Sequence, residues 1–136
     1  MTLTDTGPVV ALINRNDPNH PKCIEAAKSL PHGPLITTWP CFTEAMYLLH
    51  KGGGYPAQAA LWQLRDAGRL TLHDVGDDEM VRMAAWMLKY QDLPMDLADA
   101  SLMAAAEKFN TRLMFTLDRD FRVYRFANGD AVEVVP

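Results

Sequence analysis

Short apolar segments alternate with longer helix-like segments along the whole chain, and this alternation limits the folds open to it. Strands that alternate with helices form crossover units, in which successive strands run parallel and the helices cover the sheet. The sequence therefore predicts an α/β protein with a mostly parallel sheet of four to five strands and helices on both faces. The strands are expected at residues 3–5, 35–38, 69–73 and 113–116, with a fifth candidate at 131–135.

Proline, glycine and acidic residues mark the ends of the expected helices. Proline and acidic side chains favour the first turn of a helix, as at Asp77-Asp78-Glu79, and glycine favours its end. The segment Lys51-Gly52-Gly53-Gly54 is interpreted as a plain turn between two helices, or else as a hinge. The helices are expected at residues 8–13, 17–29, 40–50, 56–67, 77–90 and 97–108.

The composition is that of a single globular domain spanning residues 1–136. Apolar residues make up 49% of the chain and charged residues 22%, which excludes disordered and fibrous classes. The net charge of −4 provides no whole-molecule attraction to nucleic acid. A bound metal would cancel part of this charge locally, so a nucleic-acid substrate stays open.

Neither the apolar runs nor the cysteines indicate a membrane or secreted protein. No apolar run approaches the ~18 residues of a membrane span, and no basic segment precedes the first apolar run. Cys23 and Cys41 form no C-x-x-C pair and are expected to be small apolar core residues in a reducing compartment. We therefore expect a soluble cytoplasmic protein.

Four acidic residues stand where expected strands end or where the following helices begin. Asp5 closes the first strand, and Asp118 follows the fourth. Glu44 lies early in the helix after the second strand, and Asp99 lies in the first turn of the helix at 97–108. Because parallel sheets of this kind place their sites beyond the carboxyl ends of the strands, these four side chains are expected to share one pocket.

Four carboxylates in one pocket repel one another and require a counter-charge. The helix N-termini at Glu44 and Asp99 offset only ~0.3–1 kcal/mol each, so a hard divalent cation is expected. Oxygen ligands suit Mg²⁺ or Mn²⁺, and none of the four histidines has the spacing of a zinc ligand. Such an ion activates water and stabilises charge on phosphate, so the pattern predicts phosphodiester hydrolysis.

Several residues near the predicted pocket have two interpretations. Asp96 and Asp99 fit a capping pair at the start of a helix, as well as a ligand pair. Asp120 is interpreted as a solvated residue or local cap, or as a metal contact. Thr116 either orients the site by hydrogen bonding or merely ends a strand. The arginines that follow Asp118 form either a solvated face or a phosphate contact; they are Arg119, Arg122 and Arg125.

Two groups of large apolar residues are interpreted as core packing, part of which could instead bury a dimer partner. One group lies in the helix expected at 77–90 and the other in the helix expected at 56–67. Their members are Met80, Met83, Trp86 and Met87 in the first, and Leu61, Trp62 and Leu64 in the second.

Four sequence blocks around the acids resemble those of the PIN-domain family, particularly its small VapC-type toxin ribonucleases. The first two blocks are Leu3-Thr4-Asp5-Thr6 and Phe42-Thr43-Glu44-Ala45. The third begins Leu97-Ala98-Asp99-Ala100-Ser101, and the fourth is Thr116-Leu117-Asp118-Arg119-Asp120-Phe121. All four occur in family order, and the resemblance covers essentially the full length.

The resemblance implies a three-layer α/β/α sandwich around the sheet. It also implies RNA cleavage, homodimerisation and inhibition by an antitoxin protein encoded alongside. The residues that it implies as both catalytic and metal-binding, with Mg²⁺ or Mn²⁺, are Asp5, Glu44, Asp99 and Asp118. The candidate auxiliary residues are Thr6, Asp96, Thr116 and Asp120.

The sequence thus predicts a metal-dependent endoribonuclease that cleaves single-stranded or structured RNA as the toxin of a type II toxin–antitoxin pair. The alternative is a non-catalytic PIN-like binding module, whose acidic pocket captures RNA or a basic side chain of a partner. A receiver-type phosphoryl-transfer domain is disfavoured. Asp74 stands near the position of a phosphorylatable aspartate, but no acidic pair follows the first strand and no lysine stands at a later strand end.

Overall fold

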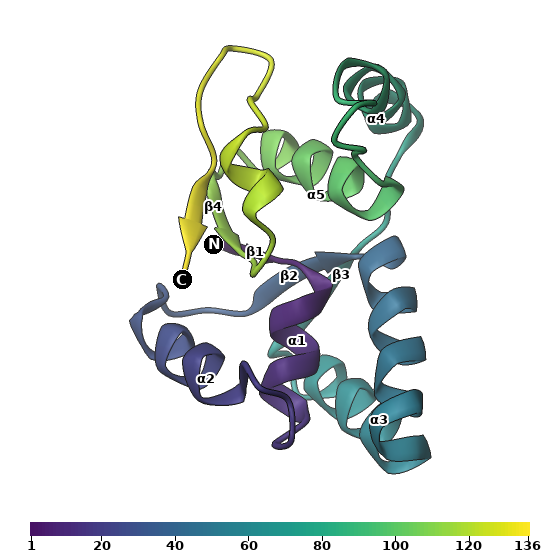
Figure 1. The fold of residues 1–136 in the computed structure, drawn as a ribbon, viewed down its shortest axis with the longest axis vertical. Coiled ribbons are helices and arrows are strands. Elements are labelled where there is room, and N and C mark those ends of the chain that lie inside the picture. The colour runs from purple at the N-terminus through teal and green to yellow at the C-terminus, as the bar shows by residue number, and fades with distance from the viewer.

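Five parallel strands form the central sheet of the computed structural model, which describes residues 1–136. Their order is β3-β2-β1-β4-β5, and every neighbouring pair is parallel (Figure 1). The predicted parallel sheet and its fifth strand are therefore confirmed. The strands are β1 (Thr2–Thr4), β2 (Leu35–Thr38), β3 (Leu70–His73), β4 (Leu113–Phe115) and β5 (Glu133–Val135).

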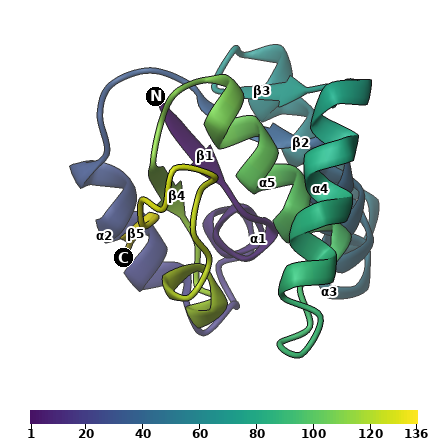
Figure 2. The same ribbon diagram turned by 90° about the horizontal axis from the view of Figure 1, so that it is seen from above.

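Helices cover both faces of the sheet, so the three-layer α/β/α sandwich is also confirmed (Figure 1). Seen from above in Figure 2, α4 and α5 lie side by side on one face. None of the helices is both long and apolar enough to cross a membrane. One face carries α4 (Asp77–Lys89) and α5 (Leu97–Lys108), and the other carries α1 (Thr6–Ile13), α2 (His20–Ser29) and α3 (Trp39–Asp66).

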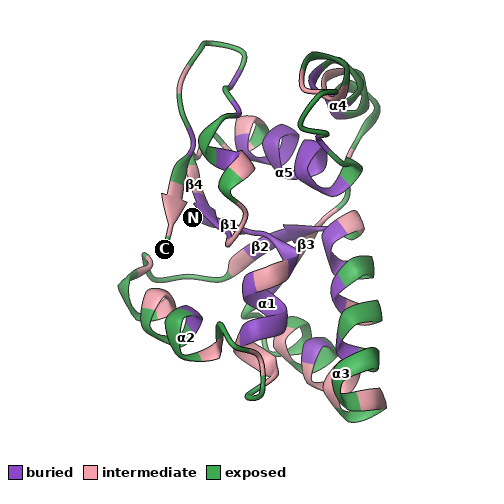
Figure 3. Cartoon of the chain, viewed as in Figure 1, coloured by how far each residue is buried: buried purple, intermediate pink, exposed green.

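Burial concentrates on the central strands, on α5 and on α1 (Figure 3). In the register of the sheet, Leu3 pairs with Ile36 on one side and with Met114 on the other, and all three side chains are buried in one cluster. Every residue of α5 from Ala98 to Ala106 is buried, because its small alanines allow the helix to lie close to the strands. The sheet and α5 thus form a rigid base for the strand ends.

The first helix begins earlier than predicted. We expected it to start at Pro8, but α1 starts at Thr6. The reason is that Asp5 is its N-cap: the Asp5 carboxylate accepts a hydrogen bond from the Thr6 N–H at 2.7 Å. The carboxylate at the end of β1 is therefore tied to the start of α1.

The second helix begins later than predicted. Instead of starting at Asp17-Pro18, α2 starts at His20. The Asp17 side chain accepts a hydrogen bond from the Asn19 N–H at 2.8 Å, which closes a local turn in place of a first helical turn. The predicted end at Ser29 is confirmed.

The glycine segment separates two helices, as expected, although the break is a kink at Gly54 and the label α3 covers both halves. Helical structure in α3 continues through Gly53, and Gly54 then adopts φ 66° and ψ −161°, outside the helical region. Only glycine takes up such a conformation without strain. Pro56 follows in the first turn of the second half of α3. A short 3₁₀ helix, η1 (Arg119–Arg122), follows Asp118 and is not among the elements predicted from the sequence.

The apolar groups are only partly in the core. Met83, Trp86 and Leu61 are buried as expected, but Met80 is 49% exposed and Trp62 is 43% exposed. The interpretation as core packing is therefore wrong for Met80, and Trp62 lies at the edge of the core, where its ring packs edge-on against buried Phe42 with 5.1 Å between ring centroids. Met87 and Leu64 are partly buried and pack against the core. Both cysteines are buried and unpaired, as expected.

Candidate functional site

The ends of β1 and β4 meet where the strand order reverses, and this is the place where parallel sheets form their sites. Asp5 directly follows β1, while Thr116 directly follows β4. The Thr116 hydroxyl donates a hydrogen bond to Asp5 Oδ2 at 2.8 Å and accepts one from the Asp118 N–H at 3.0 Å. Thr116 thus joins both strand ends, which matches the interpretation that it orients the site.

The Glu44 side chain is brought to the same rim by Thr6. The Thr6 hydroxyl lies 3.2 Å from Glu44 Oε2 and 3.2 Å from the Cys41 carbonyl oxygen, so it donates toward the start of α3. Thr6 itself is buried beside Asp5, whereas Glu44 is exposed. Glu44 therefore lies at the solvent side of the acidic site.

Asp99 projects from the first turn of α5 and is buried. Its Oδ2 atom accepts a hydrogen bond from the Tyr124 hydroxyl at 2.7 Å. Asp96 is the N-cap of α5, since its Oδ1 atom accepts a hydrogen bond from the Asp99 N–H at 2.8 Å. The capping interpretation of Asp96 matches this contact, whereas the carboxylate of Asp99 bonds Tyr124 rather than the helix start.

Burial and mutual repulsion raise the pKa values of two of the four acids. The pKa of Asp5 is raised to about 6 by burial, against the hydrogen bonds from Thr116 and Thr6, and the charges of Asp118 and Glu44 raise it further. The acids therefore share one electrostatic environment.

The pKa of Asp99 is raised more than that of Asp5. Its pKa is raised to about 8, mainly by burial, and the hydrogen bond from Tyr124 only partly offsets this. The negative charges of Asp96, Asp5 and Asp118 add to the increase. The charges of Asp5 and Asp118 therefore act on Asp99 as well, while a metal site shared by the three carboxylates stays a prediction.

No basic side chain balances these charges. None of the salt bridges in the protein includes any of the four acids. Of the histidines, His20 bonds the Ala11 carbonyl oxygen and His73 bonds Glu79, so neither serves this site. The site consists of carboxylate oxygens without an internal counter-charge, which is the donor chemistry that Mg²⁺ and Mn²⁺ prefer.

The side chains do not form a preassembled cage. No group of three or more His, Cys, Asp or Glu side chains is arranged to hold an ion unaided. Mg²⁺ usually keeps several water ligands and binds directly through only one or two carboxylates. The donor set therefore fits a hydrated ion that contacts some of the four acids through water.

The segment after Asp118 lies at the edge of the site. Asp118 Oδ1 accepts a hydrogen bond from the Asp120 N–H at 2.9 Å, so Asp118 caps η1. The pKa of Asp120 is raised, by burial first and then by the charges of Asp118 and Asp96. The Arg125 guanidinium donates to carbonyl oxygens at the end of η1, including that of Arg122 at 2.9 Å. Arg125 therefore closes this turn through Nη1, and a phosphate contact stays a prediction for all three arginines.

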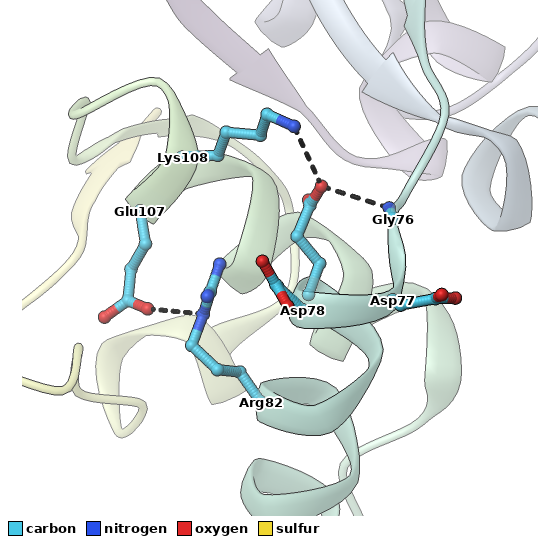
Figure 4. Close-up of a pocket in the computed structure, with 7 residues that line it drawn as sticks. Gly76, Asp77, Asp78, Arg82, Glu107 and Lys108 are labelled. Atoms are coloured by element: carbon cyan, nitrogen blue, oxygen red, sulfur yellow. Dashed lines mark hydrogen bonds and ion pairs between the residues drawn. The ribbon is translucent and has the colours of Figure 1, made fainter.

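A second polar pocket lies away from these acids, between the start of α4 and the end of α5 (Figure 4). At its centre is Glu79, which is buried and accepts hydrogen bonds from His73 Nε2 at 2.8 Å and from the Gly76 N–H at 3.2 Å. Lys108 Nζ lies 3.5 Å from the same carboxylate.

These partners decide the charge of Glu79. Burial alone would raise its pKa, but the bonds from His73 and Gly76 outweigh burial and lower it. Nearby, Arg82 pairs with Glu107 at 3.1 Å. The pocket therefore supplies its own counter-charges and joins α4 to α5.

Comparisons with known proteins agree with this geometry. No protein-family model matches the chain. Ribonuclease VapC26 of Mycobacterium tuberculosis is 27% identical over 135 residues, which cover 98% of this chain and 99% of that protein.

Two solved structures have the same fold. The crystal structure of M. tuberculosis VapC20, described as a sarcin–ricin loop cleaving toxin, matches with a TM-score of 0.83 and 22% identity over 100% of both chains. A chain of the Rickettsia felis VapBC2 complex, bound to a DNA fragment from the promoter, matches with a TM-score of 0.67 and 15% identity, covering 99% of this chain and 98% of that one. The full-length similarity to VapC26 and the fold shared with VapC20 confirm the resemblance to VapC-type PIN-domain proteins that the four sequence blocks predicted.

Proposed function

We propose that this protein is a Mg²⁺- or Mn²⁺-dependent endoribonuclease and the toxin of a type II toxin–antitoxin pair. The observation that carries the proposal is the hydrogen-bonded link from Asp5 through Thr116 to Asp118, whose charges also act on Asp99, with no salt bridge to any of these acids. The similarity to ribonuclease VapC26 over nearly the whole chain supports the same activity.

The proposed ligands are Asp5, Glu44, Asp99 and Asp118, directly or through water. A bound Mg²⁺ or Mn²⁺ supplies an activated water and a positive charge beside the scissile phosphate. The buried carboxylate of Asp5 is held by hydrogen bonds to both of its oxygens, which fixes its orientation. Glu44 is exposed, so its carboxylate is accessible from solvent.

The activity is tested with metal-free protein and two RNAs, one unstructured and one folded as a stem-loop. The stem-loop is included because the structural relative VapC20 is described as cleaving the sarcin–ricin loop. We expect cleavage with Mn²⁺, none with EDTA, and recovery when Mn²⁺ is restored. Asp99→Asn should not cleave, whereas Asp66→Asn, at the exposed end of α3, should cleave normally. Cleavage that persists in EDTA would contradict the proposal.

The role as a toxin requires a test in cells. Induced expression of the original chain should arrest growth, and expression of Asp99→Asn should not. Co-expression of an antitoxin encoded immediately upstream should relieve the arrest. We further propose that the protein acts in the cytoplasm as a homodimer. Normal growth on induction of a soluble, active chain would exclude the toxin role while leaving the nuclease activity intact.

A binding module is the rival function, since the uncompensated carboxylates would also accept a basic side chain from a partner. A module of this kind would bind RNA or protein equally well in EDTA and would leave RNA intact. The EDTA and Mn²⁺ experiment therefore separates the two functions.

A further inference from the structure

Tyr124 contacts the acidic site from a segment that the sequence blocks do not include. Its side chain is fully buried, and its hydroxyl donates to Asp99 Oδ2 at 2.7 Å. It is the one side-chain donor to the carboxylate of Asp99 among the hydrogen bonds of the protein. Tyr124 therefore acts on a proposed metal ligand without belonging to the acidic set.

The Tyr124 ring is held firmly in place. It packs edge-on against Phe121, with 5.1 Å between ring centroids and an interplanar angle of 78°. The Tyr90 ring lies tilted against it, with an interplanar angle of 55° and also 5.1 Å between centroids. Its backbone N–H donates to the Asp120 carbonyl oxygen at 3.2 Å. The position of its hydroxyl is thus fixed by the segment that follows Asp118.

This arrangement links two parts of the site that come from different elements. Asp99 belongs to α5, whereas Asp118 and Tyr124 belong to the segment after β4. The hydroxyl of Tyr124 occupies one oxygen of Asp99, and the Oδ1 atom accepts no hydrogen bond from the protein. Oδ1 is therefore the Asp99 atom left for an ion or for its bound water.

We propose that Tyr124 is a positioning residue that holds Asp99 in the orientation required for metal binding. The inference rests on the proposed function, because it concerns the same site. Partners that hydrogen-bond a metal ligand fix its orientation, and their loss commonly weakens metal affinity ~10- to 100-fold. Removal of this hydroxyl would also leave a buried carboxylate oxygen without its donor.

The test compares two tyrosine-to-phenylalanine variants in the same aromatic cluster. The Tyr90 hydroxyl accepts a hydrogen bond from the Arg125 N–H at 2.9 Å and touches none of the acids. Mn²⁺ affinity is measured by calorimetry without RNA. We expect Tyr124→Phe to bind Mn²⁺ ~10- to 100-fold more weakly, and Tyr90→Phe to bind it as the original protein does.

A third variant separates positioning from loss of packing. Phe121→Leu perturbs the same cluster without removing a donor to Asp99. If Phe121→Leu weakens Mn²⁺ binding as much as Tyr124→Phe does, the proposal is overturned. Thermal unfolding of all three variants records how far each one is destabilised.

The double variant Tyr124→Phe with Asp99→Asn tests the link between the two groups through the free energy of unfolding of the metal-free protein, because Asp99→Asn alone is expected to bind no Mn²⁺. If the hydroxyl acts through Asp99, Tyr124→Phe should change this free energy less once Asp99 is already replaced. Equal changes in stability with and without Asp99 would overturn the positioning role, as would Mn²⁺ affinity unchanged in Tyr124→Phe. If the original protein itself neither binds Mn²⁺ nor cleaves RNA, then the proposed function fails as well.

Discussion

Glu79 and Asp99 are both buried carboxylates at the start of a helix, but their surroundings shift their pKa values in opposite directions. Glu79 is bonded by His73 and lies near Lys108, and its pKa is lowered. Asp99 has only the neutral hydroxyl of Tyr124 and other acids around it, and its pKa is raised to about 8.

The difference distinguishes Glu79, whose charge is balanced within the protein, from Asp99, whose charge needs an added cation. A buried charge costs free energy unless it is paired or bound by a metal. The pocket around Glu79 contains its own cations, so that pocket contributes to folding. The site around Asp99 has none, so its unfavourable electrostatics are relieved only by protons or by an added cation.

The largest expected effect is on catalysis by the acidic site that includes Asp5 and Asp99. Replacing Asp5 by Asn removes a proposed ligand but keeps the shape of the side chain, so RNA cleavage with Mn²⁺ should fall at least ~100-fold. The free energy of unfolding without metal should not fall, since a raised pKa marks a carboxylate whose charge the fold disfavours. Gel-based cleavage rates and urea unfolding measure the two effects. An active Asp5→Asn enzyme would show that the carboxylate is not needed.

In the pocket around Glu79 we expect the reverse: a loss of stability with catalysis retained. Glu79→Gln removes the charge that pairs with His73 and Lys108, and should lower the free energy of unfolding by about 3 kcal/mol. RNA cleavage should be retained under conditions where the variant is folded. A stable but inactive Glu79→Gln protein would place Glu79 in the functional site and would remove the contrast between the two regions.

The two regions should also respond to pH with opposite signs. The folded pKa values of Asp5 and Asp99 lie above 3.8, so the folded state binds more protons than the unfolded state. Metal-free stability should therefore fall as pH rises from about 4 to 8. The pKa of Glu79 lies below its usual 4.5, so its contribution is present above that pH and is lost as pH falls through the folded value.

Urea unfolding across this pH range measures both effects. The double variant Asp5→Asn with Asp99→Asn should flatten the decline above pH 4, and saturating Mn²⁺ should reduce it in the original protein. If the stability of the double variant declined by the same amount, the decline would come from other titratable groups.

The smallest effect is expected at Asp96, which is close to the site but acts as a helix cap. Asparagine caps a helix about as well as aspartate, so Asp96→Asn should change stability by less than about 0.5 kcal/mol, whereas Asp96→Ala should cost about 1 kcal/mol. RNA cleavage by Asp96→Asn should remain close to normal. A large loss of cleavage in Asp96→Asn would make Asp96 a metal contact.

Local signals in the sequence predicted most of the fold. The helix at 97–108 has the predicted bounds because Asp96 caps its start. The parallel order of the strands follows from their alternation with helices, which also places Asp5 and Asp118 at one rim. Errors occurred where a side chain competes with the backbone, as at Asp17, whose turn delays α2.

The partners of the acids could not be predicted in the same way. The Tyr124 hydroxyl bonds a residue 25 positions earlier in the chain, and Thr116 bonds one 111 positions earlier. From sequence alone, Tyr124 is indistinguishable from other core aromatics, and Glu79 is indistinguishable from a solvated charge at a helix start. Both assignments depend on tertiary packing, which decides whether a buried carboxylate meets a cation or a hydroxyl.

The most direct test of this account is calorimetric titration of the metal-free protein with Mn²⁺ near pH 7, in buffers of different ionisation enthalpy. Because the pKa of Asp99 is raised to about 8, metal binding should displace a proton, and the measured heat should therefore depend on the buffer. We predict saturable binding with proton release in the original protein and none in Asp99→Asn. The absence of Mn²⁺ binding at millimolar concentration, or equal binding by Asp99→Asn, would contradict a metal centre at these acids.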